Sequence, residues 1–155
     1  MRTLAPLFAA AILLATGCMA DPVEGTEEEL APCPGAHTMA GVDVSVWQGH
    51  IDWHRVAAHK SFAIARAAYG TSVDSTFAYN YRSMRTEGMI RGSYQFFVPT
   101  EDGAAQADVL LRQIGTLGPG DLPPMLDVET DSHAYPSAST TRTRILAWKH
   151  RIEER

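Results

Sequence analysis

The sequence predicts an α/β fold, a parallel sheet built from four βα units of the kind found in (β/α) barrels. From Gly41 onward, short apolar or β-branched runs alternate with amphipathic helical patterns, which is the order of parallel βαβ units. A hydrophobic fraction of 45% and a charged fraction of 20% are typical of a folded globular chain. The length of 155 residues allows one domain at most.

The first eighteen residues are predicted to be a signal peptide. A basic start, Met1–Arg2, precedes an apolar run from Leu4 to Thr16, which is short for a membrane span but suits a leader. The run ends in Leu14-Ala15-Thr16-Gly17-Cys18, which resembles a bacterial lipobox, so Cys18 is the predicted lipidation site. The alternative is ordinary cleavage near Ala20 and a soluble secreted product. Both alternatives predict an exported protein, either a cell-envelope lipoprotein held to the membrane only by its lipid or an extracellular protein.

Residues 19–40 are predicted to form an acidic linker rich in proline and glycine. This segment contains four glutamates and three prolines with few residues to bury, a composition typical of unfolded segments. The chain has two cysteines. Cys18 is either lipidated or removed with the signal peptide, so no disulfide between Cys18 and Cys33 is expected. The net charge of −5 argues against a nucleic-acid partner, which usually requires a basic face.

The domain that follows spans residues 41–155. Its four strands are expected at residues 42–46, 61–68, 90–97 and 122–129, each with a helical pattern after it. Asp52, either Asp74 or Ser75, and Thr100 are expected to cap the first three helices. The last helix carries an apolar stripe formed by Thr141, Ile145, Trp148 and Ile152.

Two acids close the fourth strand. Asp127 and Glu129 are two residues apart, so on a strand they point to the same side, roughly 6–7 Å apart at the backbone. By itself this pattern is more often an ordinary surface feature. However, chemistry in (β/α) barrels sits at the C-terminal ends of strands, and Asp43 lies in the first strand of the same sheet. We therefore expect these three carboxylates to converge, in an arrangement typical of glycoside hydrolysis.

Six segments, in order and at consistent spacing, resemble glycoside hydrolase family 25, the secreted lysozymes that cleave peptidoglycan. These segments are Gly41–Gly49 with Ile51–Trp53, Phe62–Ala67, the set Asp74, Phe77 and Asn80, Gly92–Phe97, Ala105–Ala107, and Leu122–Glu129. The resemblance extends from Gly41 to about Trp148. It implies an irregular, TIM-like (β/α) barrel with a long groove.

The resemblance also implies a reaction: hydrolysis of the β-1,4 bond between N-acetylmuramic acid and N-acetylglucosamine in peptidoglycan glycan strands. Glu129 would be the general acid, Asp127 would stabilise positive charge or orient the substrate's acetamido group, and Asp43 would help hold the saccharide. No metal and no organic cofactor is expected. Oligomeric state is not predicted.

The sequence departs from the family pattern in three respects. Gln95 stands where the family usually has histidine, and the second strand ends in Ala68-Tyr69, where a polar residue before the glycine is commoner. Both changes are expected to touch the substrate groove. Family members also continue for several more strands, so the domain is expected to be incomplete at its C-terminus, with the fourth strand as a bare edge. These departures motivate an alternative function, a non-catalytic peptidoglycan-binding lipoprotein derived from such an enzyme. A third hypothesis is a barrel hydrolase acting on another glycan, such as chitin.

Four further side chains are substrate-binding candidates. Trp47 and Tyr94 offer aromatic faces to a sugar ring, and Gln95 is placed in the groove by the departure described above. Arg66 lies in an apolar strand and is expected to need a carboxylate partner. His50 and His54 have helical spacing but straddle a turn without a companion motif, so no metal site is expected there.

Overall fold

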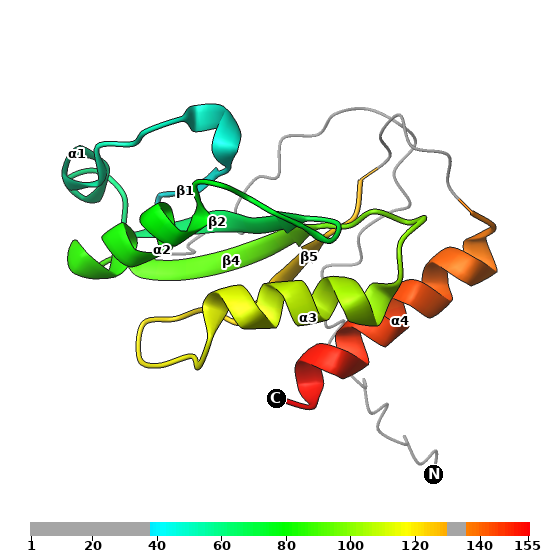
Figure 1. Cartoon of the computed structure of the whole chain (residues 1–155). Coiled ribbons are helices and arrows are strands. Elements are labelled where there is room, and N and C mark those ends of the chain that lie inside the picture. The colour runs from blue at the N-terminus through cyan, green and yellow to red at the C-terminus, as the bar shows by residue number, and fades with distance from the viewer. Residues whose placement is uncertain (1–37, 130–135) are drawn as a thin grey trace, which may run out of the picture. The chain divides into compact units, whose positions relative to one another are not determined.

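The computed structural model describes residues 38–129 and 136–155 and contains a parallel sheet with helices between its strands (Figure 1). The strands lie in the spatial order β1 (Gly41–Val44), β2 (Phe62–Tyr69), β4 (Ile90–Phe96) and β5 (Met125–Asp127). All three neighbouring pairs are parallel. A two-residue strand that was not predicted, β3 (Ser72–Val73), pairs antiparallel with the end of β2. The predicted α/β class with a parallel sheet is confirmed.

The predicted leader at residues 1–18, with Cys18, lies outside the described residues, as does nearly all of the linker at 19–40. Within the described ranges, no helix combines the length and the apolar character needed to cross a bilayer.

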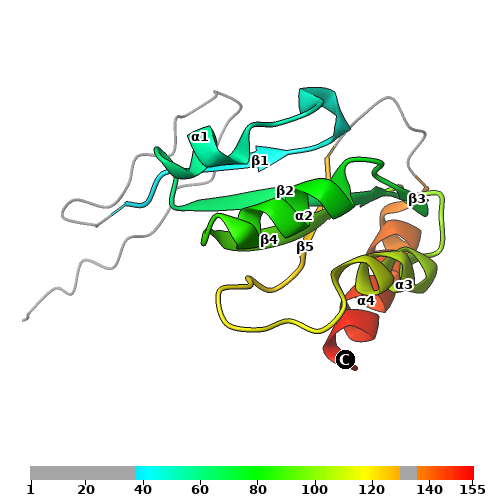
Figure 2. The same cartoon turned by 60° about the vertical axis from the view of Figure 1, so that its left-hand side comes forward.

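In the described part of the chain, one short 3-10 helix and three α-helices lie between the strands, and a fourth α-helix follows the last strand. They are η1 (Val46–Gln48), α1 (Trp53–Ala57), α2 (Phe77–Thr86), α3 (Gly103–Ile114) and α4 (Ala138–Glu153). Each strand follows its spatial neighbour in the chain, and crossovers between parallel strands are almost always right-handed, so the helices fall on one face of the sheet. Figures 1 and 2 show α3 and α4 side by side, and α2 and α3 each pack against β2 and β4.

The core lies between this face and the helices. Ala63, Ala65 and Ala67 alternate along β2 and are fully buried, because alternate residues of a strand point to the same face. Their small side chains let α2 and α3 approach closely, and Phe77, Met84 and Leu110 fill the space. The predicted apolar spacing of α2 is therefore the spacing of its buried residues.

Helix α4 is fixed to the rest of the domain by close packing and by buried polar contacts. A Cβ added to Gly103, the first residue of α3, would stand 1.9 Å from the Arg144 carbonyl oxygen of α4, so glycine permits this approach. Trp148 of α4 is buried and donates from Nε1 to Gln95 Oε1 at 2.7 Å. Gln95 Nε2 in turn donates to the carbonyl oxygens of Gly70 at 2.7 Å and Gln106 at 2.8 Å.

The predicted element boundaries differ from those observed mainly at the caps. Thr76, not Asp74 or Ser75, precedes α2 as its N-cap, and Asp102, not Thr100, caps α3 through the Ala105 N–H. The predicted cap at Asp52 is confirmed, because its side chain accepts from the Arg55 N–H at 3.2 Å. The strand expected at 122–129 is regular only at Met125–Asp127.

A buried ion pair fastens the sheet at the end where the strands begin. Asp121, with a side chain 1% exposed, pairs with Arg91 and Arg85 and accepts from the Gly118 N–H. The Arg91 guanidinium lies 3.6 Å from the centre of the Tyr81 ring. The hydrogen bond from Arg91, more than any other contact, lowers the pKa of Asp121. The contribution of ionised Asp121 to stability is therefore fully present above the ordinary pKa of an aspartate. It is lost as the pH falls through the lowered pKa of Asp121 in the folded protein.

The Trp148–Gln95 contact gives a test of how α4 is held. Trp148→Phe keeps a large aromatic ring but leaves the buried Gln95 oxygen without its donor, so the free energy of unfolding should fall by about 1–3 kcal/mol. Urea denaturation measures the change. The control is Trp47→Phe, whose indole is 82% exposed, and it should leave the urea midpoint unchanged. Equal effects of the two substitutions would contradict this account of α4.

Candidate active site

The predicted acids lie on the sheet face opposite the helices, toward the ends of the strands. Asp43 is the register partner of Ile64, and Ile64 shares its face with Arg66. Arg66 pairs with Tyr94, and Tyr94 with Met125. Met125 shares its face with Asp127, two residues further on. Because register partners and alternate residues project to the same side, Asp43, Arg66, Tyr94 and Asp127 come from four adjacent strands onto one face.

Asp127 and Glu129 interact directly. Burial, the nearby Glu129 carboxyl group and the Asp43 charge raise the pKa of Asp127, while Arg66 lowers it, and the net direction is upward. Asp127 therefore keeps its proton to a higher pH than an ordinary aspartate. The two acids thus form an interacting pair at the end of β5.

Tyr94 stands beside this pair with a protonated phenol. Burial raises the pKa of Tyr94, and the charges of Asp43, Asp127 and Asp74 raise it further, outweighing the opposite effect of Arg66. The hydroxyl is therefore a hydrogen-bond donor across the physiological pH range. Tyr94 can donate to an uncharged polar ligand such as a sugar hydroxyl or an acetamido oxygen.

Arg66 has the carboxylate partner that the sequence predicted it would need. Its Nε donates to Asp74 Oδ2 at 3.0 Å, and the two side chains are 11% and 0% exposed. The partner is Asp74, which the sequence had suggested as a helix cap, rather than Asp127 or Glu129. Arg66 still acts on the acids at a distance, because its charge lowers the pKa of Asp127.

Asp74 is the residue whose place in the site was missed. Its carboxylate accepts from the Thr76 N–H and hydroxyl, the Val46 N–H and Arg66. Burial alone would raise the pKa of Asp74, but these hydrogen bonds together lower it. The Asp-x-Thr spacing signals the local bonds. The bonds to Val46 and Arg66 depend on segments distant in sequence, and no local pattern signals them.

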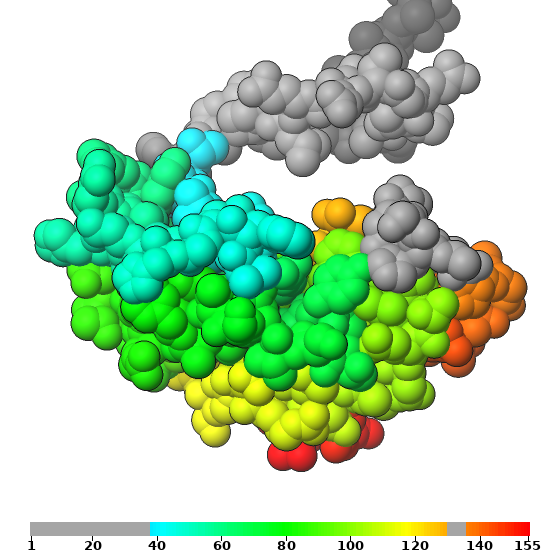
Figure 3. Space-filling model, turned by 45° about the horizontal axis from the view of Figure 1, so that its top comes forward, coloured from blue at the N-terminus to red at the C-terminus, as the bar shows by residue number. Residues whose placement is uncertain are grey.

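Trp47 lies on the short turn that follows β1. Its indole is 82% exposed. The turn is closed by a capping box, in which the Ser45 N–H donates to Gln48 Oε1 at 2.7 Å and the Ser45 hydroxyl accepts from the Trp47 N–H. Figure 3 shows the cyan segment that contains this turn on the face turned toward the viewer, with the orange segment after β5 on the same face.

Gln95 does not fit the substrate-binding role expected from the sequence. Its side chain is fully buried, and it bonds to Gly70, Gln106 and Trp148 on the helix side of the sheet. Strand alternation explains the difference. Tyr94 and Gln95 are consecutive, so only one of them can face the acids. Gln95, which departs from the family pattern, therefore lies among the residues between the sheet and the helices.

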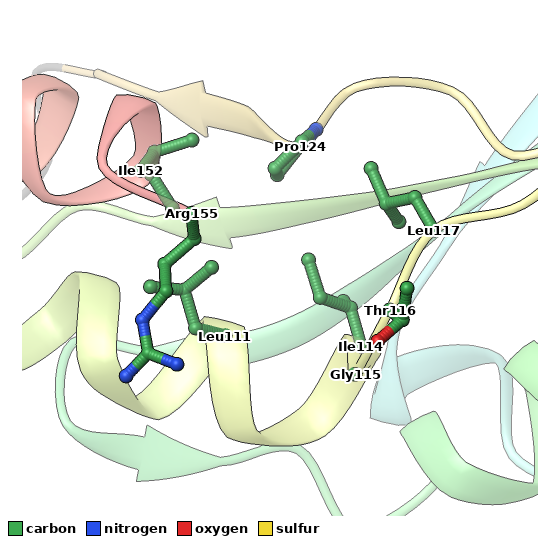
Figure 4. A pocket seen from close by; sticks show the side chains of 8 residues that line it. All are labelled: Leu111, Ile114, Gly115, Thr116, Leu117, Pro124, Ile152 and Arg155. Atoms are coloured by element: carbon green, nitrogen blue, oxygen red, sulfur yellow. The ribbon is translucent and has the colours of Figure 1, made fainter.

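A separate hollow lies at the opposite end of the strands. It has a volume of about 460 Å³ and is lined by the ends of α3 and α4 and by Pro124, just before β5 (Figure 4). Asp127 and Glu129 follow β5, so this hollow is distinct from the acid pair.

The two histidines with helical spacing lie outside the acid cluster and make separate contacts. The His50 ring centre is 4.5 Å from that of Tyr79, and His54 Nδ1 lies 3.1 Å from Glu87 Oε2. Among residues 38–129 and 136–155, no group of three histidine, cysteine or acidic side chains is placed to bind one metal ion.

Comparison with known proteins gives the site its context. The protein YegX of Escherichia coli O6:H1 is 36% identical over 129 residues, covering 79% of this chain and 46% of YegX. Lysozyme M1 of Streptomyces globisporus is 36% identical over 113 residues, covering 70% of this chain and 38% of the lysozyme. A solved family 25 glycosyl hydrolase from Bacillus anthracis aligns with a TM-score of 0.70 and 28% identity, covering 76% of this chain and 56% of that one.

The chain thus spans about half the length of the relatives that it matches. The model of the glycosyl hydrolases family 25 matches residues 42–155, which includes every strand and helix described above except Gly41, the first residue of β1. On this match and the shared fold, the chain belongs to glycosyl hydrolase family 25.

Proposed function

We propose that this chain carries the acid site of a lysozyme that hydrolyses the β-1,4 bond between N-acetylmuramic acid and N-acetylglucosamine in peptidoglycan. The observation that carries the proposal is the interacting Asp127–Glu129 pair at the end of β5, near Asp43 and Arg66 on the same face of the sheet. Similarity to lysozyme M1 supports the substrate class. The chain spans about half the length of its relatives. The proposal therefore concerns the activity of a complete family 25 domain.

Glu129 is proposed as the general acid. Cleavage passes through an oxocarbenium-like transition state, which needs a proton on the leaving oxygen and negative charge near the anomeric carbon. Glu129 is exposed at the strand end and would donate a proton to the glycosidic oxygen. Asp127 beside it, in its ionised form, would stabilise the developing positive charge.

The closeness of the two acids bears on the role of Asp127. Glu129 acts on Asp127 strongly enough to raise its pKa. This supports stabilisation of charge, or orientation of the acetamido group, as the role of Asp127.

Trp47, Tyr94, Arg66 and Asp43 are proposed to contact the glycan. The exposed indole of Trp47 suits the apolar face of a pyranose, and the protonated Tyr94 can donate to an acetamido oxygen. Arg66 and Asp43 supply opposite charges beside the pair. An exported protein, secreted or anchored through Cys18, would meet this substrate in the cell envelope.

A second candidate is a non-catalytic peptidoglycan-binding protein. Within the described part of the chain, β5 pairs with β4 on one side and forms the edge of the sheet. The acids therefore stand beside an open edge, where unpaired backbone groups are exposed. A site of this kind can bind a glycan without holding it in the geometry that cleavage requires.

The central test of the proposal is Glu129→Gln. Loss of the general acid should reduce the release of reducing ends from a peptidoglycan suspension by roughly 10²- to 10⁴-fold, with the circular dichroism spectrum unchanged. Glu87→Gln, outside the acid cluster, is the matched control and should retain activity. Full activity of Glu129→Gln would exclude Glu129 as the acid. Sedimentation with peptidoglycan but without release of reducing ends in the unsubstituted protein would favour the binding function.

The Asp127–Glu129 pair predicts an ordered change in the titration of Asp127. Glu129→Gln removes a like charge and should lower the pKa of Asp127 toward its ordinary value. Asp43→Asn removes a smaller contribution and should lower it less. Carbon-13 NMR of the Asp127 carboxyl carbon measures both shifts. The two substitutions acting in the reverse order would contradict the pairing.

Trp47 gives a test of glycan contact that is separate from proton transfer. Trp47→Ala should raise KM for peptidoglycan with little change in kcat, because it removes a contact made equally in the ground and transition states. Removing one stacking contact worth about 1 kcal/mol corresponds to roughly a fivefold change in affinity. An unchanged KM would place Trp47 outside the glycan site.

A further inference from the structure

Asp74 makes more contacts than the start of a helix requires. Its Oδ1 accepts from the Thr76 N–H at 2.9 Å and the Thr76 hydroxyl at 2.8 Å, which are local bonds. Its Oδ2 accepts from the Val46 N–H at 2.9 Å and from Arg66 Nε at 3.0 Å. With a side chain 0% exposed, Asp74 is a buried anion with donors on both oxygens.

The two long-range bonds reach parts of the site on different elements. Val46 is the first residue of η1, so its N–H lies at the base of the turn that carries Trp47. Arg66 lies on β2 beside Tyr94 of β4. The capping box of Ser45 and Gln48 fixes the internal shape of the turn, whereas Asp74 attaches the turn to the segment between β2 and α2.

We propose that Asp74 is a positioning residue of the acid site: by binding the Val46 N–H and the Arg66 guanidinium together, it fixes the Trp47 turn and Arg66 relative to the strand ends that bear the acids. The inference rests on the proposed function for its meaning in catalysis. Asp74 itself touches neither the glycan nor the reacting atoms.

The charges around Asp127 make this role measurable. Asp127 is influenced by Glu129 from its own segment, Asp43 from β1 and Arg66 from β2, and it acts in turn on Tyr94 of β4. When Asp74 is present, its negative charge partly balances that of Arg66. Without Asp74, the site carboxylates become the nearest anions to Arg66, so the pKa of Asp127 should fall.

Asp121 provides a matched control at the other end of the strands. Like Asp74, it is a buried aspartate that pairs with an arginine, accepts from a backbone N–H and has a lowered pKa. Asp121→Ala makes the same change in charge and burial as Asp74→Ala, but away from the acids. A purely structural role for Asp74 would make the two variants behave alike.

The experiment uses the full chain and NMR. In Asp74→Ala the pKa of Asp127 should fall below its value in the unsubstituted protein, and the Val46 amide should exchange at least about tenfold faster relative to amides of β2. Asp121→Ala should lower the overall stability but leave both readings unchanged. Arg66→Gln should shift the pKa of Asp127 in the opposite direction, upward.

Two further variants and readings keep the result decisive. If Asp74→Ala does not fold, Asp74→Asn retains the side-chain shape while removing the charge, and gives the same titration reading. The proposal is overturned if Asp127 titrates identically in the Asp74 and Asp121 variants, or if Val46 keeps its protection. Absence of reducing ends from the unsubstituted protein would instead count against the proposed lysozyme activity, because neither NMR reading depends on catalysis.

Discussion

The parallel register of β1, β2, β4 and β5 is the constraint on which the other features depend. Each strand is added beside its predecessor in the same direction, and right-handed crossovers then direct the helices to one face. The same register brings all the strand ends to one edge. One geometric rule therefore buries the alanine face of β2 and gathers Asp43, Arg66, Tyr94 and Asp127 on the other face.

Two buried arginine–aspartate pairs hold this sheet at opposite ends. Arg91 and Asp121 fasten the beginning of the strands, and Arg66 and Asp74 fasten the ends near the acids. Burying a charged pair gains little net stability, because the cost of removing both charges from water offsets their attraction. Their value lies in geometry, since each aspartate accepts from several donors that must all be in place together. At the acid end, that geometry includes the turn carrying Trp47.

The acids themselves combine proximity with unequal surroundings. Asp127 is half-buried beside Glu129, whereas Glu129 is exposed at the open side of the sheet. Like charges this close repel, and this repulsion together with burial raises the pKa of Asp127. Asp127 therefore keeps its proton to a higher pH beside the exposed Glu129. Arg66 limits the rise in the pKa of Asp127. Because Asp74 binds Arg66, Asp74 also influences the pKa of Asp127.

The sequence by itself determined the class of the fold and its parallel sheet, and it named the acids expected to converge. Alternation of apolar residues and turn residues is a local property, and strand ends in a parallel sheet meet by rule, so Asp43, Asp127 and Glu129 could be predicted. Tertiary structure decided the partners. Gln95 bonds inward because Tyr94, its neighbour, already occupies the acid face. Asp74 binds Val46 and Arg66 because a bulge at the end of β2 and a short turn bring distant segments together, and no local pattern of residues encodes such contacts.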